Sequence, residues 1–184
     1  VGSKGRVISI EPDRNNLDRL TASAALNPFE NIILIKRPAS NKVQEVEFFI
    51  NGDDSGGNAL WDPGEFPGNV KSKANTRLVT MTTTTLDISL AEHGFLSPKL
   101  IKVDTEGAEQ NILEGGHKLL KNAAVPFVIA ELHEFGLKKL GCSQETLRSF
   151  MEHLGYSTFI LFFNGVLPKL IPSKTQIKSR HITN

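Results

Sequence analysis

The 184-residue sequence lacks the features that would favour a secreted, membrane-spanning or nucleic-acid-binding protein. It has a single cysteine, Cys142, so no internal disulfide can form, and a reducing compartment such as the cytoplasm is expected. Its most apolar run, residues 159–163, is far shorter than the roughly 20 residues of a membrane-spanning helix. Because 21 basic residues balance 20 acidic ones, we expect neither a nucleic acid nor a membrane as partner.

What the sequence does have is an alternation of strand-like and helix-like segments. An amphipathic segment that Asp13 can cap follows the first strand-like run, and a second helix is predicted for residues 109–120. This order predicts an α/β fold with a mostly parallel, doubly wound sheet, in which ligands bind beyond the carboxyl ends of the strands. Four apolar runs without polar alternation are the predicted core strands: 6–10, 31–36, 99–104 and 126–131.

The middle and the end of the chain predict less regular elements. Residues 43–50 alternate between apolar and polar side chains and predict a half-exposed strand. The Gly-, Asp- and Asn-rich loop that follows, 51–75, is long enough to be a lid or an acceptor-binding element. Asn164-Gly165 predicts a C-terminal antiparallel hairpin. We predict a single domain over residues 1–172, and a flexible basic tail over residues 173–184.

Ionisable side chains follow three of the predicted core strands. Glu11 ends the first strand, where a carboxylate can accept hydrogen bonds from a ribose diol. Asp104 and Glu106 follow the third strand, and Glu131 and His133 follow the fourth. If these two strands are neighbours, the four side chains converge on one cleft that contains an imidazole suited to proton transfer.

Each of these residues also has a structural alternative, because acids stabilise helix starts and a histidine at a strand end is often structural. Carboxylates with one imidazole can bind a hard divalent ion. Nothing in the spacing requires one, so no metal is predicted.

The segment 100–109, which contains Asp104-Thr105-Glu106-Gly107-Ala108-Glu109, resembles the D-x-E-G-x-E signature of FkbM-type methyltransferases, and Ile112-Leu113-Glu114-Gly115-Gly116 continues the likeness. The resemblance covers roughly residues 1–160. It implies a Rossmann-like class I methyltransferase fold that binds S-adenosylmethionine (SAM) and methylates hydroxyl groups of small molecules or sugars. Three further segments agree in order and spacing: 7–12, 85–87 and 128–133.

The resemblance also implies where the methyl donor binds. Glu11 would hold the ribose of SAM, and the turn near Ala39 and Ser40 would lie beside the adenine. Asp104 would lie near the point of methyl transfer.

On the acceptor side, the resemblance places Glu106, Glu131 and His133 around the acceptor. We predict His133 as the base that removes the hydroxyl proton, with Asp104 as the second candidate. Glu131 would orient the imidazole or bind an acceptor hydroxyl, while Glu106 and Trp61 would contact the acceptor.

Two departures from the family pattern affect these expectations. In the family, a strand and a glycine-rich loop precede the strand that ends at Glu11, whereas only ten residues precede Glu11 here. We therefore expect an N-terminally truncated chain that lacks a central strand between those ending at Glu11 and Asp104 and that binds SAM poorly. In addition, Pro38 removes one N–H from the expected adenine loop.

Two other functions fit parts of the sequence. Glu11 would also suit an NAD-dependent oxidoreductase, although the only tyrosine, Tyr156, is not part of a Tyr-x-x-x-Lys pair. A catalytically inactive α/β module that binds a partner through the 51–75 loop is the second alternative.

Overall fold

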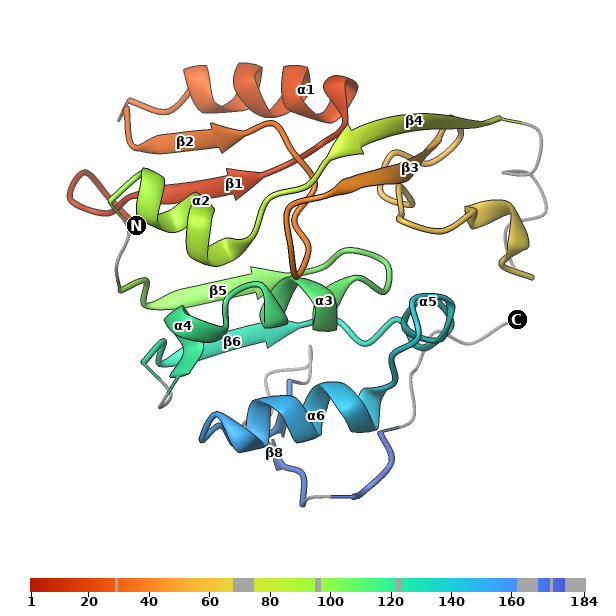
Figure 1. The fold of residues 1–184 in the computed structure, drawn as a ribbon. Coiled ribbons are helices and arrows are strands. Elements are labelled where there is room, and N and C mark those ends of the chain that lie inside the picture. The colour runs from red at the N-terminus through yellow and green to blue at the C-terminus, as the bar shows by residue number, and fades with distance from the viewer. Residues whose placement is uncertain are drawn as a thin grey trace.

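The computed structural model describes most of the chain, and Figure 1 shows the arrangement of its helices and strands. No helix in the described part is both long enough and apolar enough to span a membrane. The described residues are 1–28, 30–67, 75–94, 97–121, 124–161, 169–172 and 174–177.

The first two predicted core strands form a parallel pair. β1 (Val7–Ile10) and β2 (Ile32–Ile35) run in the same direction, and α1 (Arg14–Ala25) connects them. α1 begins where the Asp13 side chain accepts a hydrogen bond from the Asn16 backbone N–H. The helix lies alongside the pair in Figure 1. The predicted strand–helix–strand unit is confirmed.

The other two core strands, β5 (Leu100–Val103) and β6 (Phe127–Ala130), form a second parallel pair. Within the described residues β1 pairs in a sheet only with β2, and β5 only with β6. The expected parallel sheet is thus present as two separate pairs. That a central strand is missing between them stays a prediction. The β5–β6 pair buries Val103 on one face, while Leu100 and Phe127 on the other face are 53% and 67% exposed.

The segment between β5 and β6 was expected to form one helix over residues 109–120, but it forms two. α3 (Glu109–Glu114) ends at Gly115, and α4 (His117–Leu120) follows. A Cβ atom on Gly115 would lie 2.1 Å from the backbone oxygen of Ser40. The close approach of these two backbones therefore requires glycine at the position where the helix breaks.

α2 (Leu86–Glu92) is tied to α4. Thr85 is the N-cap residue of α2, and its side chain accepts a hydrogen bond from the Ile88 backbone N–H. The Asp87 carboxylate accepts hydrogen bonds from the backbone N–H groups of Lys118 and Leu119, at 3.1 and 3.0 Å. The first backbone N–H groups of a helix have no acceptor within the helix, and Asp87 supplies one for α4. The 85–87 segment thus has a structural role.

Between β2 and α2 the chain forms an antiparallel pair of strands, β3 (Glu45–Asn51) and β4 (Thr76–Thr82), which are joined by a long connection. The first part of that connection is fixed by hydrogen bonds. Ala59 bonds back to β3 as an isolated bridge, and a 3-10 helix follows at Pro63–Glu65. Residues 68–74 of the predicted loop lie outside the described part of the chain.

The C-terminal elements are α5 (Glu134–Lys139), α6 (Gln144–His153) and the antiparallel strands β7 (Phe159–Ile160) and β8 (Lys169–Leu170). The antiparallel pairing confirms the predicted C-terminal hairpin strands. The Asn164-Gly165 turn itself lies outside the described residues.

Two side chains of α6 contact the segment after β8. Arg148 is 5% exposed and donates to the backbone oxygens of Ile171, Pro172 and Thr175. Gln144 exchanges two hydrogen bonds with the Ile177 backbone. Residues 173 and 178–184 of the predicted tail are outside the described part.

An apolar core packs β5 and β6 against the helices. Its most buried members are Leu86, Leu90, Val103, Ala108, Ile112, Leu113, Leu120, Val125, Leu137 and Leu147.

Candidate functional site

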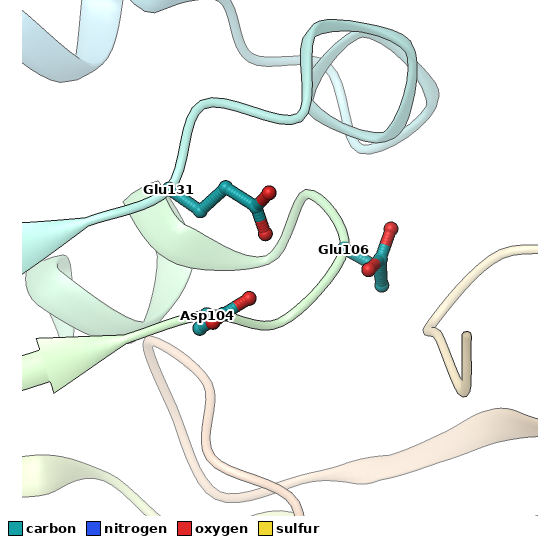
Figure 2. Close-up of side chains that lie close together, drawn as sticks. All are labelled: Asp104, Glu106 and Glu131. Atoms are coloured by element: carbon teal, nitrogen blue, oxygen red, sulfur yellow. The ribbon is translucent and has the colours of Figure 1, made fainter. Parts of the chain in front are cut away.

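Three carboxylates meet where β5 and β6 end. Asp104 directly follows β5, Glu106 lies in the loop after it, and Glu131 directly follows β6 (Figure 2). One carboxylate oxygen of each lies within 4.8 Å of the others. Because the two strands are parallel neighbours, their carboxyl ends coincide. The convergence expected from the sequence is therefore present.

A buried acid shapes the loop that carries Glu106. Glu109, at the start of α3, is fully buried, and its Oε1 accepts hydrogen bonds from the backbone N–H groups of Thr105 and Gly107, each at 3.0 Å. The hydroxyl of Thr105 donates to the same oxygen at 3.2 Å. Burial raises the pKa of Glu109, while these hydrogen bonds act in the opposite direction. Glu109 is a structural residue of the site.

The loop after β5 also packs backbone against backbone on the start of α5. A Cβ atom on Gly136 would lie 2.1 Å from the backbone oxygen of Glu106. Gly107, with φ 111°, has equally little space, since its Cβ would lie 2.2 Å from the Gly136 carbonyl carbon. Directly before Gly107 the chain turns at Glu106, a non-glycine residue with φ 55°. Gly136 was not predicted as a site residue, and nothing in the local sequence indicates this contact.

His133 lies beside Glu106, and its ring is oriented by the backbone. It is the N-cap residue of α5, and its Nδ1 accepts the hydrogen bond of the Gly136 N–H at 3.0 Å. A neutral imidazole has one protonated nitrogen, so this contact assigns the proton to Nε2. Nε2 lies 3.4 Å from Oε2 of Glu106.

A cluster of aromatic side chains packs around His133. Two of them come from the connection between β3 and β4, and one comes from α5. Trp61 stacks on the imidazole with ring centroids 5.7 Å apart and an interplanar angle of 17°. Phe66 packs at an angle against His133, and Phe135 contacts both Trp61 and Phe66 edge-on. Trp61 is only 7% exposed, and its Nε1–H donates to the backbone oxygen of Glu106 at 2.6 Å. Trp61 is thus packed behind the loop that carries Glu106.

The three carboxylates have different neighbours. Asp104 is exposed and forms an ion pair with Lys102, with 2.5 Å between Nζ and Oδ2. Glu106 faces His133. Three carboxylate oxygens this close can accept hydrogen bonds from several hydroxyl groups of one ligand, and they could also coordinate a hard divalent ion.

Apart from Asp104, the residues predicted to bind the methyl donor lie on other elements. Glu11 follows β1, and its Oε1 accepts the Asp13 N–H at 2.8 Å. Burial is the main cause that raises the pKa of Glu11, and the charge of Asp13 raises it further. Glu11 does not belong to the carboxylate cluster.

Ala39 and Ser40 are buried in the turn that follows β2. Ala39 pairs with Thr84 as an isolated bridge, and the Ser40 N–H donates to the Thr84 oxygen at 2.8 Å. An open pocket of about 350 Å³ adjoins this turn, lined by Lys36, Arg37, Pro38, Met81 and Thr82.

The chain is similar to a known protein family over most of its length. The model of the family described as methyltransferase FkbM domain matches residues 1–158. No curated protein and no solved structure matches the chain. The family match supports methyl transfer as the type of reaction.

Proposed function

The chain belongs to the FkbM methyltransferase domain family, and we propose that it transfers a methyl group from SAM to a hydroxyl oxygen of a small molecule or sugar. The observation that carries the proposal is the convergence of Asp104, Glu106 and Glu131 at the carboxyl ends of neighbouring parallel strands. This is the edge at which α/β sheets bind their ligands. Carboxylates accept hydrogen bonds from hydroxyl groups, so the cluster suits a polyhydroxylated acceptor.

The residues on the β1–β2 side fit a nucleoside-type donor. The Glu11 carboxylate has two oxygens, of which Oε1 accepts the Asp13 N–H, and it retains capacity for a ribose hydroxyl. The turn at Ala39 and Ser40, with the adjoining pocket, would lie on the adenine side. When bound, SAM supplies a methyl group on a positively charged sulfur.

The cluster residues would act on the acceptor in two ways. By binding its hydroxyl groups, they would fix one oxygen in line with the methyl carbon, which supplies much of the rate of a displacement reaction. They would also receive the proton that the hydroxyl loses as its oxygen forms the new bond to carbon. The roles predicted for His133, Asp104 and Glu131 in this proton transfer stay predictions.

The first test is a calorimetric titration of S-adenosylhomocysteine into the full-length protein, expressed with any residues that its gene encodes before Val1, and into its Glu11→Ala variant. We expect binding that weakens by about tenfold in Glu11→Ala, because a ribose hydroxyl loses a charged hydrogen-bond acceptor. Glu92→Ala, at an exposed position of α2, is the matched control and should bind as the wild type does.

The second test follows a labelled methyl group from SAM into a panel of sugars and small alcohols. Incorporation into an ether that resists mild base identifies the product of O-methylation. If the folded full-length protein does not bind S-adenosylhomocysteine, the proposal is wrong, and a binding module becomes the better description. Titration of NAD should give no heat of binding, and a clear signal would favour the oxidoreductase alternative.

A further inference from the structure

Glu106 is held at two points. Its backbone oxygen accepts the hydrogen bond of the Trp61 indole N–H at 2.6 Å, and its carboxylate lies 3.4 Å from Nε2 of His133. Trp61 and His133 in turn stack on each other. The residues come from three separate segments of the chain, and all three converge on one side chain.

The backbone at Glu106 adopts a conformation that is unfavourable for a residue with a side chain. Glu106 has φ 55°, in the left-handed region where a side chain is disfavoured and glycine is readily accommodated. A glutamate here is retained at a conformational cost, and the Trp61 hydrogen bond stabilises the peptide group that adopts this conformation.

On this basis we propose that Trp61 and His133 are positioning residues, and that they hold the Glu106 carboxylate where it accepts the hydrogen bond of the acceptor hydroxyl. The inference rests on the proposed methyltransferase function and deepens it. It assigns contact with the acceptor to Glu106 and a supporting role to His133 and Trp61, which the sequence alone had placed against the acceptor.

The geometry of His133 favours this assignment over direct action of the imidazole. Its Nδ1 lone pair accepts the Gly136 N–H, and its Nε2 faces the Glu106 carboxylate. Trp61 and Phe66 pack against the ring. The His133 side chain is 13% exposed, whereas that of Glu106 is 29% exposed. A ligand at the strand ends would therefore reach Glu106 more readily than the histidine.

Two substitutions at His133 separate its two nitrogens. Asparagine places an oxygen near the position of Nδ1, so His133→Asn can still cap α5 through the Gly136 N–H but cannot reach Glu106. Glutamine places an amide N–H near the position of Nε2, so His133→Gln can still donate to Glu106 but caps α5 poorly.

The experiment compares both variants with the wild-type full-length protein in three measurements: urea unfolding, S-adenosylhomocysteine affinity and methyl-transfer kinetics. For His133→Asn we expect the smaller loss of stability of the two variants, because the cap is kept while the ring contacts with Trp61 and Phe66 are lost, and a kcat about ten- to hundredfold lower than that of the wild type. For His133→Gln we expect a lower unfolding midpoint but a higher kcat than for His133→Asn. S-adenosylhomocysteine affinity should change less than about twofold in both, because the two variants alter only the acceptor side.

Trp61→Phe tests the other contact. Phenylalanine preserves an aromatic ring against His133 but lacks the indole N–H that holds the Glu106 oxygen. We expect kcat to fall by about tenfold with S-adenosylhomocysteine affinity unchanged.

If His133 acts only through its cap, activity will follow stability, and His133→Gln will be less active than His133→Asn. That order in an active wild type would overturn this inference while leaving the methyltransferase function intact. A wild-type protein that neither binds S-adenosylhomocysteine nor transfers methyl would overturn both.

Discussion

Replacing Glu109 by glutamine should preserve the loop after β5 and change how the stability of the protein depends on pH. Glu109 Oε1 accepts three hydrogen bonds, from the backbone N–H groups of Thr105 and Gly107 and from the Thr105 hydroxyl. A glutamine side chain oxygen can accept the same three bonds. Alanine can accept none of them, and it leaves two backbone N–H groups without their acceptor.

The magnitude for Glu109→Ala follows from these contacts. An unsatisfied buried donor costs about 1–3 kcal/mol, so the loss of the two backbone acceptors should lower the free energy of unfolding by about 4 kcal/mol. This is a large fraction of the roughly 5–15 kcal/mol that stabilises a typical domain. Glu109→Gln should cost less than about 1 kcal/mol at acidic pH, where the wild-type side chain is protonated and equally neutral.

The pH dependence has a definite sign. Burial raises the folded-state pKa of Glu109 above its ordinary value of 4.5. Between the ordinary and the raised pKa the folded protein binds more protons than the unfolded chain, so the contribution of Glu109 to stability falls as the pH rises through this window. Glutamine does not titrate. The stability of Glu109→Gln relative to the wild type should therefore increase as the pH rises from 4 to 8.

Urea unfolding of the wild type and Glu109→Gln at pH 4, 6 and 8 measures this difference. Because every other titrating group is common to the two proteins, the difference between their free energies of unfolding isolates Glu109. Circular dichroism at low urea checks that both are folded. A difference that stays constant over this range, or that changes in the opposite direction, would refute the reasoning.

Three further substitutions test individual contacts of the fold, one at the site and two on α6. Gly136→Ala places a Cβ about where the Glu106 oxygen lies, so we expect a loss of about 3 kcal/mol, measured by urea unfolding. Ser143→Ala removes the side chain that accepts the Thr146 N–H at the start of α6, and thermal unfolding should show a loss of about 1 kcal/mol. Arg148→Met removes the donors that hold three backbone oxygens after β8, so limited proteolysis should cleave near residues 174–177 faster than in the wild type; unchanged cleavage would contradict this role.

The sequence predicts the core strands and the acids that follow them because both signals are local. Apolar runs place β5 and β6 to within about a residue, and Asp104 and Glu131 follow directly from those boundaries. The division of 109–120 into two helices could not be predicted in the same way. It depends on the approach of the Ser40 backbone to Gly115, and these residues are far apart in the sequence.

The roles of the site residues are harder to predict than their convergence. The loop composition around Trp61 indicated a lid or an acceptor contact, but the indole is buried against Glu106 and His133. α5 was not predicted, although acidic Glu134 and basic Lys138 at helical spacing were available as a signal. Without that helix, the orientation of His133 as its cap could not be deduced.

Repulsion among the three clustered carboxylates should make the stability of the protein depend on salt concentration. Like charges within 4.8 Å repel each other, and Lys102 forms an ion pair with Asp104. Glu131→Gln should therefore raise the urea midpoint of unfolding at low salt and lower the rate of methyl transfer. Such an opposition is expected where a binding site costs some stability. Salt screens repulsion between partly exposed charges, so the gain should shrink between 10 mM and 500 mM salt, about a sevenfold change in Debye length. A gain of equal size at both concentrations would show that repulsion is not its cause.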